Sequence, residues 1–109
     1  MNLRRNKTIS KVNSPVLSAL SLCRKAGKLV VGYELTAEAA SKKNILVVYS
    51  SDISERTLKN VRRLAENGSS VQCLNKTMDE IEQAVGKRFG VAGVVDSGLA
   101  GLVQSKIEC

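Results

Sequence analysis

A continuous apolar run, Ile45-Leu46-Val47-Val48-Tyr49 followed by Ser50, places the strongest constraint on the fold of this chain. Strands that face solvent on one side alternate between apolar and polar residues, and this run does not alternate. Continuous apolar strands occur where both faces of a sheet are covered. We therefore predict that residues 45–50 form a central strand with helices on both sides.

Segments with helical spacing of apolar residues alternate with short apolar segments along the rest of the chain. Helices are expected at about 15–26, 33–43 and 54–66, in a segment that ends at Gly86, and after Asp96 or Ser97. Strands are expected at 29–31, 70–74 and 91–95. Such alternation favours short crossovers. The predicted fold class is α/β, a three-layer α/β/α sandwich with a four-stranded mixed sheet.

Capping residues support several of these helix starts. Ser14-Pro15 places an N-cap residue before a proline at the first helical position, and Thr77-x-x-Glu80 has the pattern of a capping box. The helix at 54–66 has two candidate caps, because Asp52 with Glu55 resembles a capping box and Ser54 is an alternative.

The chain of 109 residues has the length of one domain. Residues 1–13 are expected to form a flexible basic tail, because they contain four cationic residues and no acidic one, namely Arg4, Arg5, Lys7 and Lys11. Residues 14–109 are expected to form a single α/β/α domain.

The charge balance points to a polyanionic partner. Seventeen Lys and Arg against ten Asp and Glu give a net charge of +7, which favours nucleic acid through steering and counterion release. Part of this charge has a simpler explanation. The helix at 54–66 carries Arg56, Lys59, Arg62 and Arg63, but Glu55–Lys59 and Arg62–Glu66 are spaced i,i+4, as in a solvated helix face.

Several chemical functions lack the residues that they need. The chain has no histidine, so histidine-based catalysis is excluded, and Asp52 after the central strand is the best remaining acid for an enzyme. No nucleotide-binding glycine motif is present. The three cysteines have no metal-ligand or disulfide spacing, and we expect Cys23 and Cys73 to be buried hydrophobes. We predict no enzyme activity, no metal and no cofactor.

No segment has the length of a membrane span or the pattern of a secretory signal, so a cytoplasmic protein without membrane partners is expected. Aromatic residues are also few: Tyr33, Tyr49 and Phe89. Three are too few for the stacking platforms that read single-stranded RNA. Bound RNA would be recognised by shape and backbone.

The stretch from Arg24 to Thr36 is the candidate anion site. It reads Arg-Lys-Ala-Gly-Lys-Leu-Val-Val-Gly-Tyr-Glu-Leu-Thr, which combines three cations, a glycine turn, a short strand and a new helix start. Unpaired N–H groups at that helix start would attract an anion near Gly32 to Leu35. Many helix starts after glycine bind only water, and that alternative stays open.

Three segments together resemble the kink-turn-binding ribosomal proteins of the seven-Ae type. They are Arg-Lys-Ala-Gly-Lys-Leu-Val-Val-Gly from Arg24, Ile-Leu-Val-Val-Tyr-Ser-Ser-Asp from Ile45, and Val-Gly-Lys-Arg-Phe-Gly-Val-Ala-Gly-Val-Val from Val85. The resemblance covers about Ser14 to Val103 and is greatest to the small bacterial, ribosomal-protein-like members. It implies an α/β/α sandwich that grips a bent RNA helix through two loops.

The resemblance also implies the site residues. The family's G-x-N-E segment falls on Gly32-Tyr33-Glu34-Leu35, and the second loop falls on Lys87-Arg88-Phe89-Gly90. The implied RNA-binding residues are Lys28, Gly32, Tyr33, Glu34, Lys87, Arg88 and Phe89. Lys28 and Arg88 would hold phosphate, and Glu34 would contact a base edge.

The sequence departs from the family pattern at both loops. Without a gap, Glu34 and Leu35 stand at the asparagine and glutamate positions and the family's lysine becomes Glu38. With one deletion, Glu34 takes the glutamate position, the asparagine is lost and the lysine becomes Ala37. The second loop is more basic than usual. Two functions follow. The first is a non-enzymatic RNA-binding protein, associated with the ribosome or with a structured RNA such as a riboswitch-like kink-turn. The second is a protein-interaction module on the same fold, with kink-turn recognition lost.

Overall fold

The computed structural model describes residues 14–107, so the predicted basic tail at 1–13 and Cys109 lie outside the described residues. The elements follow the predicted order. They are α2 (Pro15–Lys25), β1 (Leu29–Val31), α3 (Tyr33–Lys42), β2 (Leu46–Tyr49), α4 (Glu55–Glu66), β3 (Ser70–Cys73), α5 (Met78–Val85), β4 (Val91–Val94) and α6 (Ser97–Lys106).

The four strands form one mixed sheet in the order β1-β4-β2-β3. Strand β2 is parallel to β3 and antiparallel to β4, while β1 pairs antiparallel with β4. Val47 in the middle of β2 lies opposite Val71 on one side and Gly93 on the other. The prediction that residues 45–50 contain a central strand is therefore confirmed.

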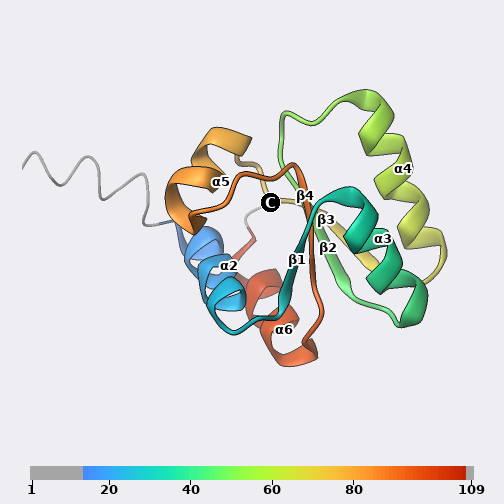
Figure 1. Ribbon diagram of the computed structural model, residues 1–109, viewed down its shortest axis with the longest axis horizontal. Coiled ribbons are helices and arrows are strands. Elements are labelled where there is room, and N and C mark those ends of the chain that lie inside the picture. Colours follow the sequence, from blue (N-terminus) through green and yellow to red (C-terminus); the bar gives the residue numbers. More distant parts are fainter. Residues whose placement is uncertain (1–13, 108–109) are drawn as a thin grey trace, which may run out of the picture.

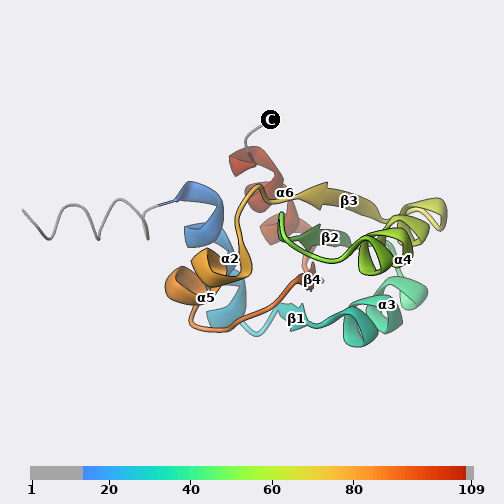
Figure 2. The same cartoon turned by 90° about the horizontal axis from the view of Figure 1, so that it is seen from above.

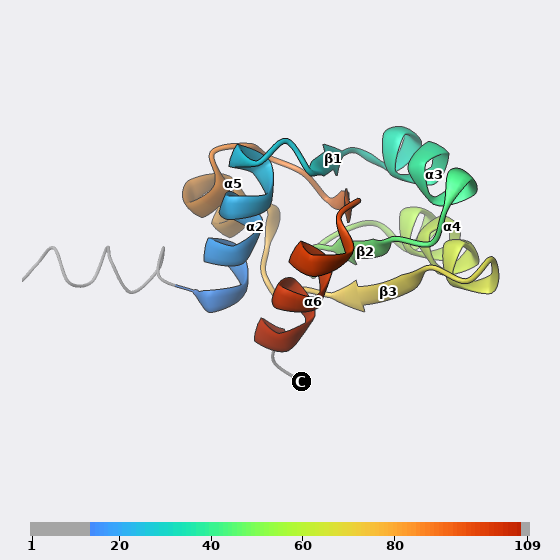
Figure 3. The same ribbon diagram turned by 90° about the horizontal axis from the view of Figure 1, so that it is seen from below.

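Helices cover both faces of this sheet, with α2, α5 and α6 on one side and α3 and α4 on the other (Figure 1). The views from above and below show the same separation of the two helical layers (Figures 2 and 3). Alternate residues of β2 pack against the two helical layers. Leu46 and Val48 pack with α2, and Val47 packs with α4. The predicted three-layer α/β/α fold is confirmed.

A glycine in β4 lets α3 approach the sheet closely. A Cβ built on Gly93 would lie 2.8 Å from Cδ1 of Ile45 and 3.1 Å from Cγ2 of Thr36 in α3. These distances are shorter than ordinary van der Waals contact. The missing side chain at this position therefore sets how closely α3 packs on β4, and α3 begins at the candidate site.

Side chains cap four of the five described helices, whereas the start of α3 at Gly32 has no side-chain cap. Ser14, Ser54 and Asp96 accept hydrogen bonds from backbone N–H groups three positions later. Thr77 and Glu80 form the predicted reciprocal capping box, with 2.9 Å between the Thr77 nitrogen and Oε1 of Glu80. Of the two candidate caps for α4, the structure selects Ser54.

Candidate nucleic-acid interface

Gly32 turns the chain from β1 directly into α3. Its N–H group donates to the carbonyl oxygen of Val91 at 2.8 Å, and its own carbonyl accepts from the Thr36 N–H at 3.0 Å. Its backbone has φ 100° and ψ 149°. This region is almost restricted to glycine, so the start of α3 is anchored to β4 in a conformation that other residues resist.

The loop from Gly86 to Gly90 returns the chain to the same end of the sheet. Gly86 ends α5 in the left-handed conformation with φ 86°, and the carbonyl oxygen of Gly90 accepts from the Ser50 N–H at 2.9 Å. A Cβ on Gly90 would lie only 2.8 Å from Cγ2 of Ile53. Close backbone approach at Gly90 therefore joins this loop to the end of β2 and to the start of α4.

These segments surround an open pocket of about 420 Å³, here called the Gly32 pocket. Residues from the end of β1, the starts of α3, α4 and α5, and the loop before β4 line it: Val31, Gly32, Tyr33, Ile53, Ser54, Thr57, Met78, Arg88, Phe89, Gly90 and Val91. The structure thus confirms that Gly32 and the 86–90 loop share one end of the sandwich.

Carboxylates from α5 hold Arg88 at the rim of the pocket. Its guanidinium forms ion pairs with Asp79 and, at 3.3 Å, with Glu82. These hydrogen bonds, first to Asp79 and then to Glu82, raise the pKa of Arg88 above its ordinary value. The arginine stays half-exposed, but its charge is already opposed by two nearby negative charges.

Asp52 lies beside the same rim and does not cap α4. Its carboxylate accepts from the Met78 N–H at 3.1 Å, which places a negative charge at the first residue of α5. The buried Ser50 hydroxyl makes no hydrogen bond of ordinary length within residues 14–107, yet it lies near enough to favour the charged carboxylate. The Ser50 hydroxyl, followed by the backbone N–H of Met78, lowers the pKa of Asp52. This role is structural and requires no catalysis.

The structure separates the other predicted site residues into three groups. Glu34 and Lys87 are exposed close to the pocket segments, and Tyr33 is half-buried in its wall. Phe89 lines the pocket but is only 4% exposed, because its ring packs in the core with α2 and α5. It is therefore unavailable as a stacking platform.

Lys28 lies at the opposite end of β1. Its carbonyl oxygen accepts from the Val95 N–H at 3.0 Å, beyond the far end of β4. The three residues of β1 separate it from Gly32, roughly 13 Å along an extended chain. Lys28 therefore lies at the other end of β1 from the Gly32 turn, although the two are only four positions apart in sequence.

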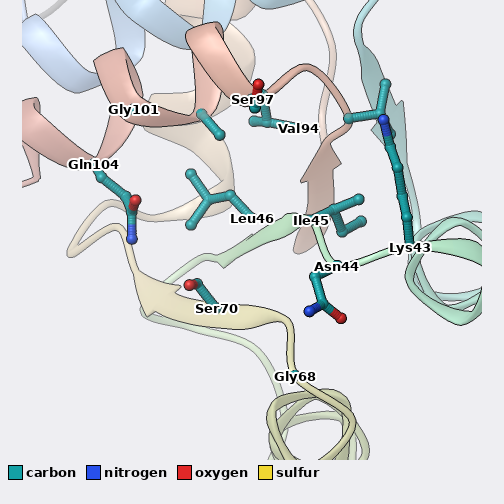
Figure 4. A pocket seen from close by; sticks show the side chains of 12 residues that line it. Lys43, Asn44, Ile45, Leu46, Gly68, Ser70, Val94, Ser97, Gly101 and Gln104 are labelled. Atoms are coloured by element: carbon teal, nitrogen blue, oxygen red, sulfur yellow. The ribbon is translucent and has the colours of Figure 1, made fainter.

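A second pocket of about 330 Å³ occupies that opposite end, between the start of α6 and the starts of β2 and β3 (Figure 4). Leu46 and Val94 form its apolar part, while Asn44, Ser70 and Gln104 supply polar side chains. None of the predicted RNA-binding residues lines it.

Within residues 14–107 there is no group of three or more potential metal ligands, and no helix is long and apolar enough to cross a membrane. Cys23 is buried as predicted, and its burial, followed by the charge of Asp96, raises the pKa of its thiol. Cys73 is half-buried, which is less than predicted. Its strand lies at the edge of the sheet, so only one side of β3 is covered by a neighbouring strand.

Comparison with known proteins identifies the family. The chain is 35% identical to the RNA-binding protein YlxQ of Enterococcus faecium over 94 residues, which cover 84% of this chain and 90% of that protein. The chain belongs to the YlxQ family. A solved structure of a protein with unknown function from Bacillus halodurans superposes with a TM-score of 0.80 at 26% identity, covering 87% of this chain and 98% of that one. No model of a known protein family matches the chain.

Sequence reasoning missed one wall of the Gly32 pocket. Ile53, Ser54 and Thr57 come from the loop before α4 and its first turn, and Met78 opens α5. The sequence patterns at these residues are helix-capping patterns, which indicate where a helix begins but not which helix starts lie near one another in the fold. Their meeting at one pocket depends on β2 and β3 ending side by side.

Proposed function

We propose that this protein is a non-enzymatic RNA-binding protein that holds a structured, kink-turn-like RNA at the Gly32 pocket. The observation that carries the proposal is the meeting of two segments, the glycine-initiated start of α3 and the 86–90 loop, at one open pocket. The RNA-binding name of the Enterococcus faecium relative supports the same class of partner. We further propose that it acts in the cytoplasm, as a ribosome-associated protein.

The start of α3 supplies donors for an RNA. Helix geometry leaves the N–H groups of Tyr33, Glu34 and Leu35 without partners in their own helix, and the macrodipole adds partial positive charge there. Gly32 has no side chain, and a Cβ built on it would meet no atom within 4 Å. The space beside Gly32 is therefore open, so an RNA backbone can approach the turn that begins α3.

Glu34 supplies an acceptor beside those donors. It lies in the first turn of α3 and is exposed, with no ion pair to another described residue. A carboxylate in this position can accept from the amino group of a base edge, which gives sequence preference that phosphate contacts lack. The pocket volume of about 420 Å³ falls within the range of single small-ligand sites, so it suits one unstacked base.

The test compares a kink-turn RNA with a plain duplex of equal length. Glu34→Gln keeps the size of the side chain but removes its charge, and it should weaken kink-turn binding by about 1–3 kcal/mol, roughly 5- to 150-fold, with little effect on the duplex. Glu38→Gln is the matched control, because it removes the same charge one turn later from a residue that pairs with Lys42 at 3.8 Å.

Two outcomes would contradict the proposal. An equal gain in kink-turn affinity from Glu34→Gln and Glu38→Gln would show that only the net charge matters, because each variant removes one negative charge. Wild-type protein that binds neither RNA, or binds both equally at moderate salt, would instead support a protein-interaction module on this fold. The departures at Leu35 and Glu38 from the family pattern make that second function the relevant competitor.

A further inference from the structure

The cations of α4 are exposed and have no carboxylate partner. Within residues 14–107 the ion pairs are Lys42–Glu38, Arg88–Asp79 and Arg88–Glu82, and none of them involves α4. The sequence spacing had suggested i,i+4 pairs of Lys59 with Glu55 and of Arg62 with Glu66. The structure contains neither pair, so a charge-balanced helix face does not account for these residues.

Three of these cations form one stripe. Arg56, Lys59 and Arg63 follow the spacing i, i+3, i+7, which places them on the same side of a helix over about 10 Å. The orientation of this side is fixed, because Val61 is 0% and Leu64 is 7% exposed on the face that packs against the sheet. The three cations, here called the α4 stripe, therefore point outward as a row.

The α4 stripe begins next to the Gly32 pocket. Ser54 and Thr57 of the first turn of α4 line that pocket, and Arg56 lies between them in sequence. Arg56 is thus within about one helix diameter, roughly 10–12 Å, of the pocket wall. Ser54 and Thr57 lie on a different side of α4 from Arg56, so a polymer with one nucleotide in the pocket would reach the stripe by passing over the first turn of α4.

The start of α5 lies beside the start of α4 at this pocket and has a different electrostatic character. On the α5 side, Asp79 and Glu82 oppose the charge of Arg88, and the Asp52 carboxylate lies at the start of the same helix. Asp79 and Glu82 therefore leave Arg88 little net attraction for phosphate, while Lys87 beside it is exposed and has no ion pair with another described residue. Among the described residues beside the pocket, unpaired cations are therefore concentrated on the outer side of α4, whereas the start of α5 is rich in carboxylates.

We propose that the α4 stripe is the phosphate-binding surface for the RNA held in the Gly32 pocket, so that the RNA backbone leaves the pocket along α4 and away from α5. This inference rests on the proposed function and adds a direction to it. Arg88 is then a positioning residue that ties the 86–90 loop to α5. Its paired charge contributes little to phosphate attraction.

The experiment measures RNA affinity against salt concentration for two double variants of equal net charge. Arg56→Gln with Arg63→Gln removes the ends of the stripe, while Lys25→Gln with Lys106→Gln removes two exposed cations from the other helical layer. Glutamine has nearly the helix propensity of arginine and lysine, so both proteins should fold, which circular dichroism verifies. The RNA probe is a kink-turn with a duplex arm, compared with the plain duplex.

Each lost phosphate contact should reduce the slope of log affinity against log salt by about 0.7–0.9. The α4 double variant should therefore reduce the slope by roughly 1.4–1.8 and weaken binding at least 10-fold at low salt. The Lys25/Lys106 variant should keep the wild-type slope. Arg88→Gln should also change the slope little, which separates this proposal from phosphate binding by Arg88.

The outcomes separate the inference from the function on which it rests. If Glu34→Gln weakens kink-turn binding but the α4 double variant keeps the wild-type slope, the pocket stands and the stripe is wrong. Equal effects of the two double variants would show attraction by net charge alone and would also overturn the stripe. Wild-type protein that binds no RNA overturns both proposals.

Discussion

Replacement of Gly32 by alanine should destabilise the protein through backbone strain alone. A Cβ at Gly32 meets no atom within 4 Å, so no steric clash contributes. The backbone at φ 100° and ψ 149° lies next to a region that only glycine occupies readily, and a residue held there costs about 1–3 kcal/mol. Alanine also restricts the unfolded chain, which offsets about 0.4–1 kcal/mol of this strain.

The net expectation for Gly32→Ala is a loss of about 1–2 kcal/mol in the free energy of unfolding. For a domain of this size that loss lowers the Tm by roughly 4–16 °C, which thermal and urea unfolding can both measure. The strain acts on the turn that starts α3, so RNA binding at the Gly32 pocket should weaken as well.

Gly101→Ala is the matched control, because a Cβ there also meets no atom within 4 Å but the backbone is helical. Alanine at this position should stabilise the protein by about 0.5–1 kcal/mol. If Gly32→Ala is as stable as the wild type or more so, the argument from backbone strain is refuted.

Three further predictions concern the core, the caps and acid stability. Val47→Asp should unfold the domain, because Val47 is 0% exposed between the layers and an unpaired buried charge costs several kcal/mol. A normal melting curve for this variant would contradict the prediction. The control variant Val47→Ala should stay folded. Thr77→Ala should cost about 1 kcal/mol in urea unfolding by removing the capping box, whereas Thr77→Ser should retain most of it. The pKa of Asp52 in the folded protein is below its ordinary value of 3.8. The charged carboxylate therefore stabilises the fold at pH values above 3.8, and this stabilisation is lost as the pH falls through the lower pKa of the folded state. Asp52→Asn should therefore reduce the loss of stability on acidification below about pH 4, and an unchanged pH profile would refute the role of this carboxylate at α5.

Much of the fold follows from interactions between residues close in sequence. The starts of α2 and α5 were predicted because Ser14 and Thr77 bond to N–H groups only three residues away. The central strand was predicted because both of its faces are apolar. Such signals do not depend on distant parts of the chain, which is why element order and layer number agree with the sequence prediction.

The candidate site was predicted only in part, because it depends on contacts between residues that are far apart in sequence. Sequence placed the Gly32 turn and the 86–90 loop together through a family resemblance, and the structure confirms their proximity. It did not predict that Phe89 is in the core or that Lys28 is at the other end of the sheet. The position of Phe89 depends on how the loop before β4 packs against α2 and α5. The position of Lys28 depends on the register of β1 with β4, which pairs residues more than 60 positions apart.

The sequence by itself determined the helices, the buried central strand and the net charge of +7. Only the tertiary structure decided which of those charges are available to a partner. Arg88 meets Asp79 and Glu82 because α5 and its following loop fold back on each other, whereas the α4 cations have no carboxylate of residues 14–107 within ion-pair distance. Charge is a sum over residues, but its availability depends on distances between side chains, and these distances exist only once the chain is folded.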